Sequence, residues 1–444
     1  MKADQLIARP EVELHKPATF NGAFFWLSAF YFVYCGRPED WIPGLEYIPL
    51  AKISGVLALL GLLSLGSTQR KFRDLPKESK YLLGLIGILF ASAAFSPIWK
   101  GGALNRTLDF AKVWVVWLLT FLLVTDVARL RRIIYIQSVS VAVISVVSIV
   151  RGHSQPRLEG VIGGIYSNPN DLAFAIVLTL PFCLAFLLTA KKALFRLLWL
   201  AAILIMGLTL FMTASRAGFI SLMISGTVCL WYFGVKGRRF YLVAISGVAV
   251  VLLLAVAGGP LISRMTAIEG NADTQLGATA YDSYEARKYL MERAIEGVKQ
   301  YPILGLGAGD FQVYSGSWHD VHMTYLQIAV EGGIPALILY LLFFSRGFSN
   351  LRKLLRRSDL DAHTRLLIGA LHSSMIGFVI GAMFAPEAYQ FFPYFSVAYT
   401  SALLAMFKDR ALASETPASG KDWRTRYRTA RAGKAKSGDL SLIR

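Results

Sequence analysis

Long apolar blocks, separated by short loops rich in lysine and arginine, constrain this chain more than any other feature of its sequence. Hydrophobic residues make up 55% of its 444 residues, and its mean hydropathy is +0.51. This apolar share is too high for a soluble domain of ordinary composition. In lipid, only helices and closed barrels satisfy every backbone polar group, and these blocks lack the alternation of barrel strands. The sequence therefore predicts an all-α polytopic membrane protein.

Each block of about 20 residues can cross a bilayer as one helix, and we count about twelve such blocks. We predict a multi-pass membrane domain over residues 1–408 and a basic, disordered cytoplasmic tail over residues 409–444. The polar stretch that ends at Thr19 leads straight into the first span, so we expect no cleavable signal peptide. The predicted spans are 20–36, 47–66, 81–97, 107–125, 133–150, 172–189, 197–212, 217–233, 241–256, 325–344, 366–383 and 391–407.

Basic residues gather in alternate loops and in the tail, as the positive-inside rule describes for cytoplasmic segments. All of these loops lie on one side of the membrane if both termini are cytoplasmic. This bias accounts for the net charge of +18 without a polyanion, so we expect membrane lipids as partners and no nucleic acid. The opposite, non-cytoplasmic face then contains the large loop 257–324, between the ninth and tenth spans.

This loop contains a pattern typical of an amphipathic helix. The sequence Asp282-Ser283-Tyr284-Glu285 matches a capping box, which predicts a helix from there to about Gln300. Pro302 then ends the helix. We expect this helix to lie along the membrane surface or to pack on the bundle. The predicted apolar stripe consists of Leu290, Met291, Ala294, Ile295 and Val298.

Arg216 lies at the outer start of the predicted span 217–233, with almost no loop to hold it. A helix N-terminus offers free backbone N–H groups and the positive end of a dipole, to which arginine adds a full charge. Together with Ser215, this arrangement suits a phosphate. The alternative is an arginine that reaches the membrane interface or pairs with a carboxylate. The sequence leaves both interpretations open, although a charge within a membrane segment favours a function.

His322 precedes the span 325–344, and its imidazole suits a general base at the edge of the membrane. The alternative is a loop histidine that makes a hydrogen bond and has no catalytic role. His319 and His322 could share one helical face, but no third zinc ligand is evident by spacing. Because Cys35, Cys183 and Cys229 all lie in apolar blocks, we expect neither a disulfide framework nor a cysteine-based metal site. We expect no other metal and no cofactor.

A glycine-rich turn that includes Gly305 and Gly307 resembles a nucleotide-binding loop only superficially, because it follows a helix and faces away from the cytoplasm. We expect a tight turn that brings the backbone close to a ligand or to another helix. Glu331 lies inside the next predicted span, close to Gly333 and Pro335. This combination indicates a break in the helix and a charge that faces the interior of the bundle.

Arg157 and Arg287 lie on the same predicted face as Arg216. Each arginine by itself is more often solvated or paired than bound to a ligand. Three guanidinium groups on one side are nevertheless what a diphosphate at a membrane surface requires.

In this order and on one face, these motifs resemble the superfamily of O-antigen ligases and O-antigen polymerases, which are bacterial envelope glycosyltransferases. The likeness is strong from Arg157 to Pro335 and weak over the first four spans. Met323 stands where the family usually has asparagine. The motifs that carry the resemblance are Arg157-Leu158-Glu159-Gly160, Asn168-Pro169-Asn170, Ser215-Arg216-Ala217-Gly218, Arg287, residues 301–311, residues 322–327 and Glu331-Gly332-Gly333.

The resemblance implies a metal-independent transfer of a glycan from undecaprenyl diphosphate at the periplasmic face of the bacterial inner membrane. By this likeness, Arg216 and Arg287 hold the diphosphate, aided by Arg157, and His322 activates the acceptor hydroxyl. The residue chemistry agrees, because arginine stabilises a departing diphosphate and imidazole accepts a proton. The supporting positions are Ser215, Glu331, Gly305 and Gly307.

The sequence does not identify the acceptor of the glycan. A ligase attaches the glycan to a lipid A core or another acceptor, whereas a polymerase attaches it to a second lipid-linked repeat unit. We favour a ligase, because the large loop lies late in the chain and contains the histidine. A secondary transporter is the alternative from another class, but it would show midplane charges and repeat-related broken helices. Here the unusual residues gather at one face, which favours an enzyme.

Overall fold

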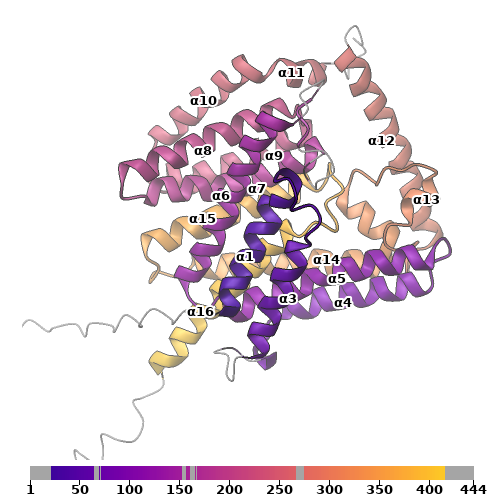
Figure 1. Cartoon of the computed structure of the whole chain (residues 1–444), viewed down its shortest axis with the longest axis horizontal. Helices are drawn as coiled ribbons and strands as arrows, with labels where there is room; N and C mark the ends of the chain where they lie inside the picture. The colour runs from indigo at the N-terminus through magenta and orange to yellow at the C-terminus, as the bar shows by residue number, and fades with distance from the viewer. Residues whose placement is uncertain are drawn as a thin grey trace, which may run out of the picture.

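The computed structural model describes residues 22–64, 70, 72–152, 157–160, 166, 168–266 and 275–415, and the regular structure of these residues is entirely helical (Figure 1). This confirms the all-α class. The first half of the chain contains α1 (Gly22–Gly36), α2 (Pro38–Trp41), α3 (Leu50–Leu63), the short 3-10 helix η1 (Phe72–Asp74), α4 (Lys77–Ala94), α5 (Lys100–Leu123), α6 (Val127–Arg151) and α7 (Pro169–Thr189). The rest of the chain contains α8 (Ala193–Met212), α9 (Arg216–Leu230), the π-helix η2 (Trp231–Val235), α10 (Tyr241–Ala257), α11 (Gly259–Thr266), α12 (Gln275–Gln300), α13 (Phe311–Ser315), α14 (Thr324–Leu355), α15 (Ala362–Gly381) and α16 (Phe392–Glu415).

Each predicted span overlaps one of these helices. Within the described residues, six helical segments are long and apolar enough to cross a membrane: α6, α7, α8, α9 continued by η2, α14 and α15. Three further helices, α1, α3 and α10, are apolar but shorter. These findings indicate an integral membrane protein. The count of twelve spans and the orientation of the termini stay predictions.

The exposed side chains of α10 show why this bundle needs an apolar solvent. Leu242 is the residue of α10 that the bundle buries, whereas apolar side chains along the rest of the helix point outward. In water, such a face would be an aggregation-prone patch, but lipid tails solvate it without penalty. The large apolar side chains that α10 exposes are Val243, Ile245, Val248, Val251, Leu252 and Val256.

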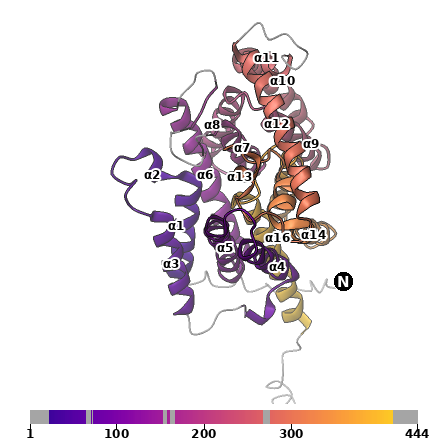
Figure 2. The same cartoon turned by 90° about the vertical axis from the view of Figure 1, so that its right-hand side faces the viewer.

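The helices form two groups that meet around α14, α15 and α16. In one group, α7 packs against α8, α9 and α15, and in the other α4 packs against α5 and α14. The helix α12 contacts α11, α13 and α14, and it descends from α11 toward α13 along the edge of the molecule (Figures 1 and 2). The helix α12 therefore packs on the bundle, which was one of its two expected arrangements.

The start of α12 differs from the prediction. The helix begins at Gln275, so the capping-box sequence at Asp282 lies inside it and cannot cap its first turn. The physical reason is that the residues just before Asp282 include good helix formers and no proline, so nothing ends the helix there. The other end is as predicted, because α12 ends at Gln300, two residues before Pro302.

The predicted apolar stripe of α12 is divided between two faces. Leu290 and Ala294 are buried in a cluster with residues of α13 and α14, and Val298 packs against this cluster. Met291 and Ile295 stay exposed by 44% and 41%. The reason is geometric: positions four apart lie in one line along a helix, while the next residue is turned away by about 100°.

The helix α14 is broken at Gly333, as predicted from Gly333 and Pro335. Gly333 has φ 78° and ψ 174°, a backbone conformation that glycine adopts far more readily than other residues. A Cβ at this position would also lie 2.2 Å from the carbonyl oxygen of Ile303. The N–H of Ile334 leaves the helical pattern and donates to the carbonyl oxygen of Pro302 at 2.8 Å. The break is therefore the point at which the glycine-rich turn crosses α14.

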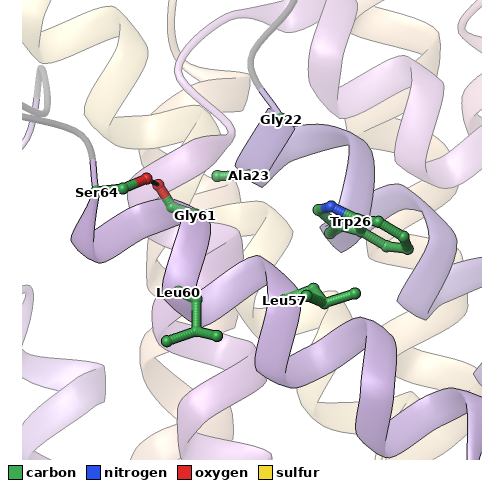
Figure 3. Close-up of a pocket in the computed structure, with 7 residues that line it drawn as sticks. All are labelled: Gly22, Ala23, Trp26, Leu57, Leu60, Gly61 and Ser64. Atoms are coloured by element: carbon green, nitrogen blue, oxygen red, sulfur yellow. Dashed lines mark hydrogen bonds between the residues drawn. The ribbon is translucent and has the colours of Figure 1, made fainter.

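Two features lie away from this region. An apolar pocket of about 410 Å³ lies between α1 and α3, near Ala23 and Leu60 (Figure 3). It is at the opposite end of α1 from Cys35, whose carbonyl oxygen accepts a hydrogen bond from Tyr166 in the loop before α7.

At the other end of the chain, α16 continues to Glu415, past the predicted domain boundary, and the rest of the predicted tail lies outside the described residues.

Candidate functional site

The glycine-rich turn adopts a backbone that only glycine adopts readily. Gly305, Gly307 and Gly309 have φ values of 69°, 112° and 81°. The N–H groups of Leu306 and Gly307 donate to the carbonyl oxygens of Val330 and Glu331, at 2.9 and 3.0 Å. These carbonyl groups end the first half of α14, so the turn caps that half at the break. Of the two expected roles, the structure shows the approach to another helix.

Glu331 faces the interior of the bundle, as predicted, and is fully buried. The hydroxyl of Tyr389 donates to its Oε2 at 2.5 Å, and the hydroxyl of Ser92 donates to its backbone carbonyl oxygen at 2.7 Å. The guanidinium of Arg106 lies 5.1 Å from the centre of the Tyr389 ring. Neither Tyr389 nor Arg106 was singled out in the sequence.

Arg157 and Ser215 meet at one amide group. The Nε of Arg157 donates to the carbonyl oxygen of Thr213 at 2.8 Å, and its Nη2 donates to Oδ1 of Asn170 at 3.2 Å. The hydroxyl of Ser215 donates to the same Oδ1 at 2.8 Å and accepts from the N–H of Gly218 at 3.1 Å, which makes Ser215 the N-cap of α9. The structure therefore joins the Arg157 segment to the turn that begins α9 at Arg216.

His322 lies directly before α14, and its Nδ1 is 3.0 Å from the carbonyl oxygen of Asp320. A carbonyl oxygen only accepts, so Nδ1 carries the hydrogen and Nε2 keeps its lone pair. Burial lowers the pKa of His322 to about 4, and the positive charges of Arg287 and His319 act in the same direction. The charge of Arg287 thus acts on His322, and the imidazole is neutral at neutral pH. This is the state that a general base needs.

The loop 382–391, between α15 and α16, is the part of the site that sequence reasoning missed. The carbonyl oxygens of Ala382 and Ala385 accept from the N–H and the hydroxyl of Thr324, at 2.8 and 2.7 Å. The carboxyl group of Glu387 lies next to that of Asp171 at the start of α7. The available signal was the carboxylate of Glu387, which interrupts an otherwise apolar stretch.

The loop 382–391 connects two parts of the site: the turn that begins α9 at Arg216, and the segment before α14 that contains His322. Ala385 packs against Ala217, the residue after Arg216, and against Phe174 of α7. Through Thr324 the same loop reaches the segment that contains His322. The predicted residues from distant parts of the chain therefore gather around one end of the bundle. Among the described residues, no group of three or more His, Cys, Asp or Glu side chains is arranged to hold a metal ion.

Met323, which replaces the usual asparagine, is the N-cap of α14 and makes no side-chain cap hydrogen bond. Asparagine is among the best N-cap residues, because its side chain accepts from the first free N–H groups of a helix. Here the carbonyl oxygen of Ala382 accepts from the first of these groups, the N–H of Thr324. The loop 382–391 therefore supplies part of the cap that the methionine lacks.

Comparison with known proteins agrees with the sequence motifs. Residues 201–341 match the model of a family described as O-antigen ligase. No curated protein matches the chain. The matched range is less than half of the chain, but it contains Ser215, Arg216, Arg287, His322 and Glu331. The resemblance to the superfamily of O-antigen ligases and polymerases, whose members are membrane glycosyltransferases, is thereby confirmed for this part of the chain.

Proposed function

We propose that this protein, whose residues 201–341 match the O-antigen ligase family, transfers a glycan from undecaprenyl diphosphate to an acceptor hydroxyl at the periplasmic face of the inner membrane. Both termini are cytoplasmic in this proposal. The observation that carries it is a neutral imidazole, that of His322, with an available Nε2 and within the electrostatic influence of the Arg287 guanidinium. A base beside an anion-binding cation is what transfer from a diphosphate requires.

In the proposed reaction, the bond between the anomeric carbon of the glycan and the diphosphate oxygen breaks, and the acceptor oxygen forms a bond to the same carbon. Nε2 of His322 takes the proton of the acceptor hydroxyl. Arg216, Arg287 and Arg157 stabilise the negative charge that grows on the departing diphosphate. Diphosphate bound beside Arg287 would also offset the charge that lowers the pKa of His322, so donor binding would strengthen the base.

Deletion of the gene tests this proposal and separates its two forms. If the protein is a ligase, polymerised glycan should accumulate on the undecaprenyl carrier and none should reach the final acceptor. If it is a polymerase, single repeat units should still reach the acceptor, and only the chain length should collapse. The measurement is a gel of surface glycan beside extracted lipid-linked intermediates. Normal glycan in both fractions would contradict both enzyme functions and favour a transporter.

Arg287→Gln should change the pH dependence of transfer in a direction that the site predicts. In the wild-type protein, kcat/KM should fall only as the pH approaches about 4, because His322 is neutral above its lowered pKa. Removing the positive charge of Arg287 raises this pKa toward its ordinary value, so the acid limb should move to higher pH. The measurement is kcat/KM against pH with detergent-purified protein.

The control for this experiment is Arg293→Gln on the same helix. Arg293 pairs with Glu296, and it is not among the causes that shift the pKa of His322. The acid limb of the kcat/KM profile of Arg293→Gln should lie at the same pH as that of the wild-type protein. An unchanged limb in Arg287→Gln as well would show that His322 is not the titrating base.

A further inference from the structure

One face of α14 carries three polar side chains that are almost completely buried. Thr324, Gln327 and Glu331 are spaced at three and four residues, which places them on the same side of a helix. Their exposed fractions are 0%, 1% and 0%. In a bundle with this apolar composition, such a row needs polar partners or a ligand.

The loop 382–391 packs against this row and adds a second set of polar groups. The N–H of Glu387 donates to the hydroxyl oxygen of Thr324 at 2.9 Å, and Tyr389 donates to Glu331. Glu387 is buried too, and its carboxyl group lies next to that of Asp171. Burial and the neighbouring carboxylate both raise the pKa of Glu387, so a negative charge on both groups is disfavoured.

Three oxygens of these buried groups have no hydrogen-bond partner within the described part of the chain. They are Oε1 of Gln327 and Oε1 of Glu331, on the α14 row, and Oε1 of Glu387, in the facing loop. All three atoms are acceptors. A buried acceptor without a partner costs free energy unless a ligand or water donates to it. The complementary ligand is therefore one that presents several donors.

The buried acceptor groups of α14 and of the loop 382–391 lie in the same part of the bundle as His322, and their charge limits the chemical class of ligand that they can bind. Asp320, whose carbonyl oxygen holds His322, lies close enough for its charge to act on both Asp171 and Glu331. Carboxylates repel a diphosphate, whereas carboxylate and amide oxygens accept hydrogen bonds from hydroxyl groups. The arginines therefore suit the diphosphate, and the row on α14 suits the hydroxyls of a sugar.

We propose that Gln327 and Glu387 form a subsite that binds sugar hydroxyls next to His322. This inference rests on the proposed glycosyl transfer, which supplies a reason for a sugar at this place. The sugar belongs either to the glycan of the donor or to the acceptor, because both must approach the base during transfer. In each case, the two side chains act as positioning residues rather than catalytic ones.

Gln327→Leu is the sharpest test, because the unpartnered oxygen makes no hydrogen bond within the described chain that the substitution would break. We expect the full-length variant to keep or raise its thermal midpoint, since it removes a buried unsatisfied acceptor. Its KM should rise about tenfold, while kcat stays within about twofold, as expected when binding shared by substrate and transition state is lost. Glu387→Gln should raise KM in the same direction.

Binding measurements separate the two sources of the sugar. The probes are two soluble oligosaccharides: the repeat unit released by mild acid from the lipid carrier, and the deacylated sugar portion of the acceptor. Saturation-transfer NMR with the detergent-purified full chain should detect one of them. Gln327→Leu should weaken that signal about tenfold. The source is the donor if the repeat unit binds and the acceptor if the other probe binds.

Thr179→Val is the matched control, because Oγ1 of Thr179 is also buried without a partner but lies on α7, two helical turns beyond Asp171. It should leave oligosaccharide binding unchanged. His322→Ala should bind the oligosaccharide normally but lack transfer. If the wild-type protein lacks transfer while Gln327→Leu still weakens binding, the proposed reaction fails and the subsite stands. Wild-type binding of both probes by Gln327→Leu, or no binding by the wild-type protein, would overturn the subsite.

Discussion

His322→Ala should lower glycan transfer by roughly a hundred- to ten-thousandfold, which is the usual cost of losing a general base. The acceptor hydroxyl has a pKa far above neutrality and is a poor nucleophile until a base takes its proton. In the structure, the backbone carbonyl of Asp320 holds Nδ1, so Nε2 is the atom available for that role. No other histidine of the described site has this arrangement, because Nδ1 of His319 lies beside the hydroxyl of Ser317.

The cell-based measurement is the gel of surface glycan and lipid-linked intermediates, with protein amounts equalised by immunoblot. His322→Ala should reproduce the deletion phenotype. The matched control is His363→Ala, because His363 is exposed at the start of α15, at the opposite end of that helix from the 382–391 loop. Normal glycan in a stably expressed His322→Ala strain would remove this residue from the mechanism.

Arg216→Lys should lose most of the transfer activity, although it keeps the positive charge. Lysine presents a compact ammonium group, which cannot reproduce the planar two-point contact of guanidinium with phosphate oxygens. Arg216→Ala should lose more, roughly a hundredfold or above, as expected when a group that stabilises developing charge is removed. The N-cap hydrogen bond, which the N–H of Gly218 donates to the hydroxyl oxygen of Ser215, does not involve the Arg216 side chain, so the start of α9 should stay intact in both variants.

Transfer by purified Arg216→Lys and Arg216→Ala, assayed with extracted lipid-linked glycan, measures this effect. Arg356→Lys is a suitable control, since Arg356 is exposed beyond the far end of α14. It should transfer glycan at the wild-type rate. If Arg216→Ala also transferred normally at equal protein levels, Arg216 would be a structural arginine, and the alternative interpretation from the sequence would be correct.

The sequence by itself determined the features that depend on local composition. Apolar blocks of the required length predicted a helix at each expected position, because a chain of this hydropathy can satisfy its backbone in lipid only by forming helices. Local signals also predicted the end of α12 before Pro302 and the break of α14 near Gly333 and Pro335. Helix ends and breaks of this kind can be predicted because proline and glycine change the allowed backbone conformations wherever they occur.

Only the tertiary structure decided which residues meet. The capping-box pattern at Asp282 was misleading, since a cap works only where a helix begins, and the preceding residues continued α12. Glu387 was passed over as a single carboxylate between two apolar spans. Its contacts with Thr324 and Asp171, residues 63 and 216 positions away, depend on how distant helices pack. No local pattern encodes such contacts, because they form from side chains that the fold alone brings together.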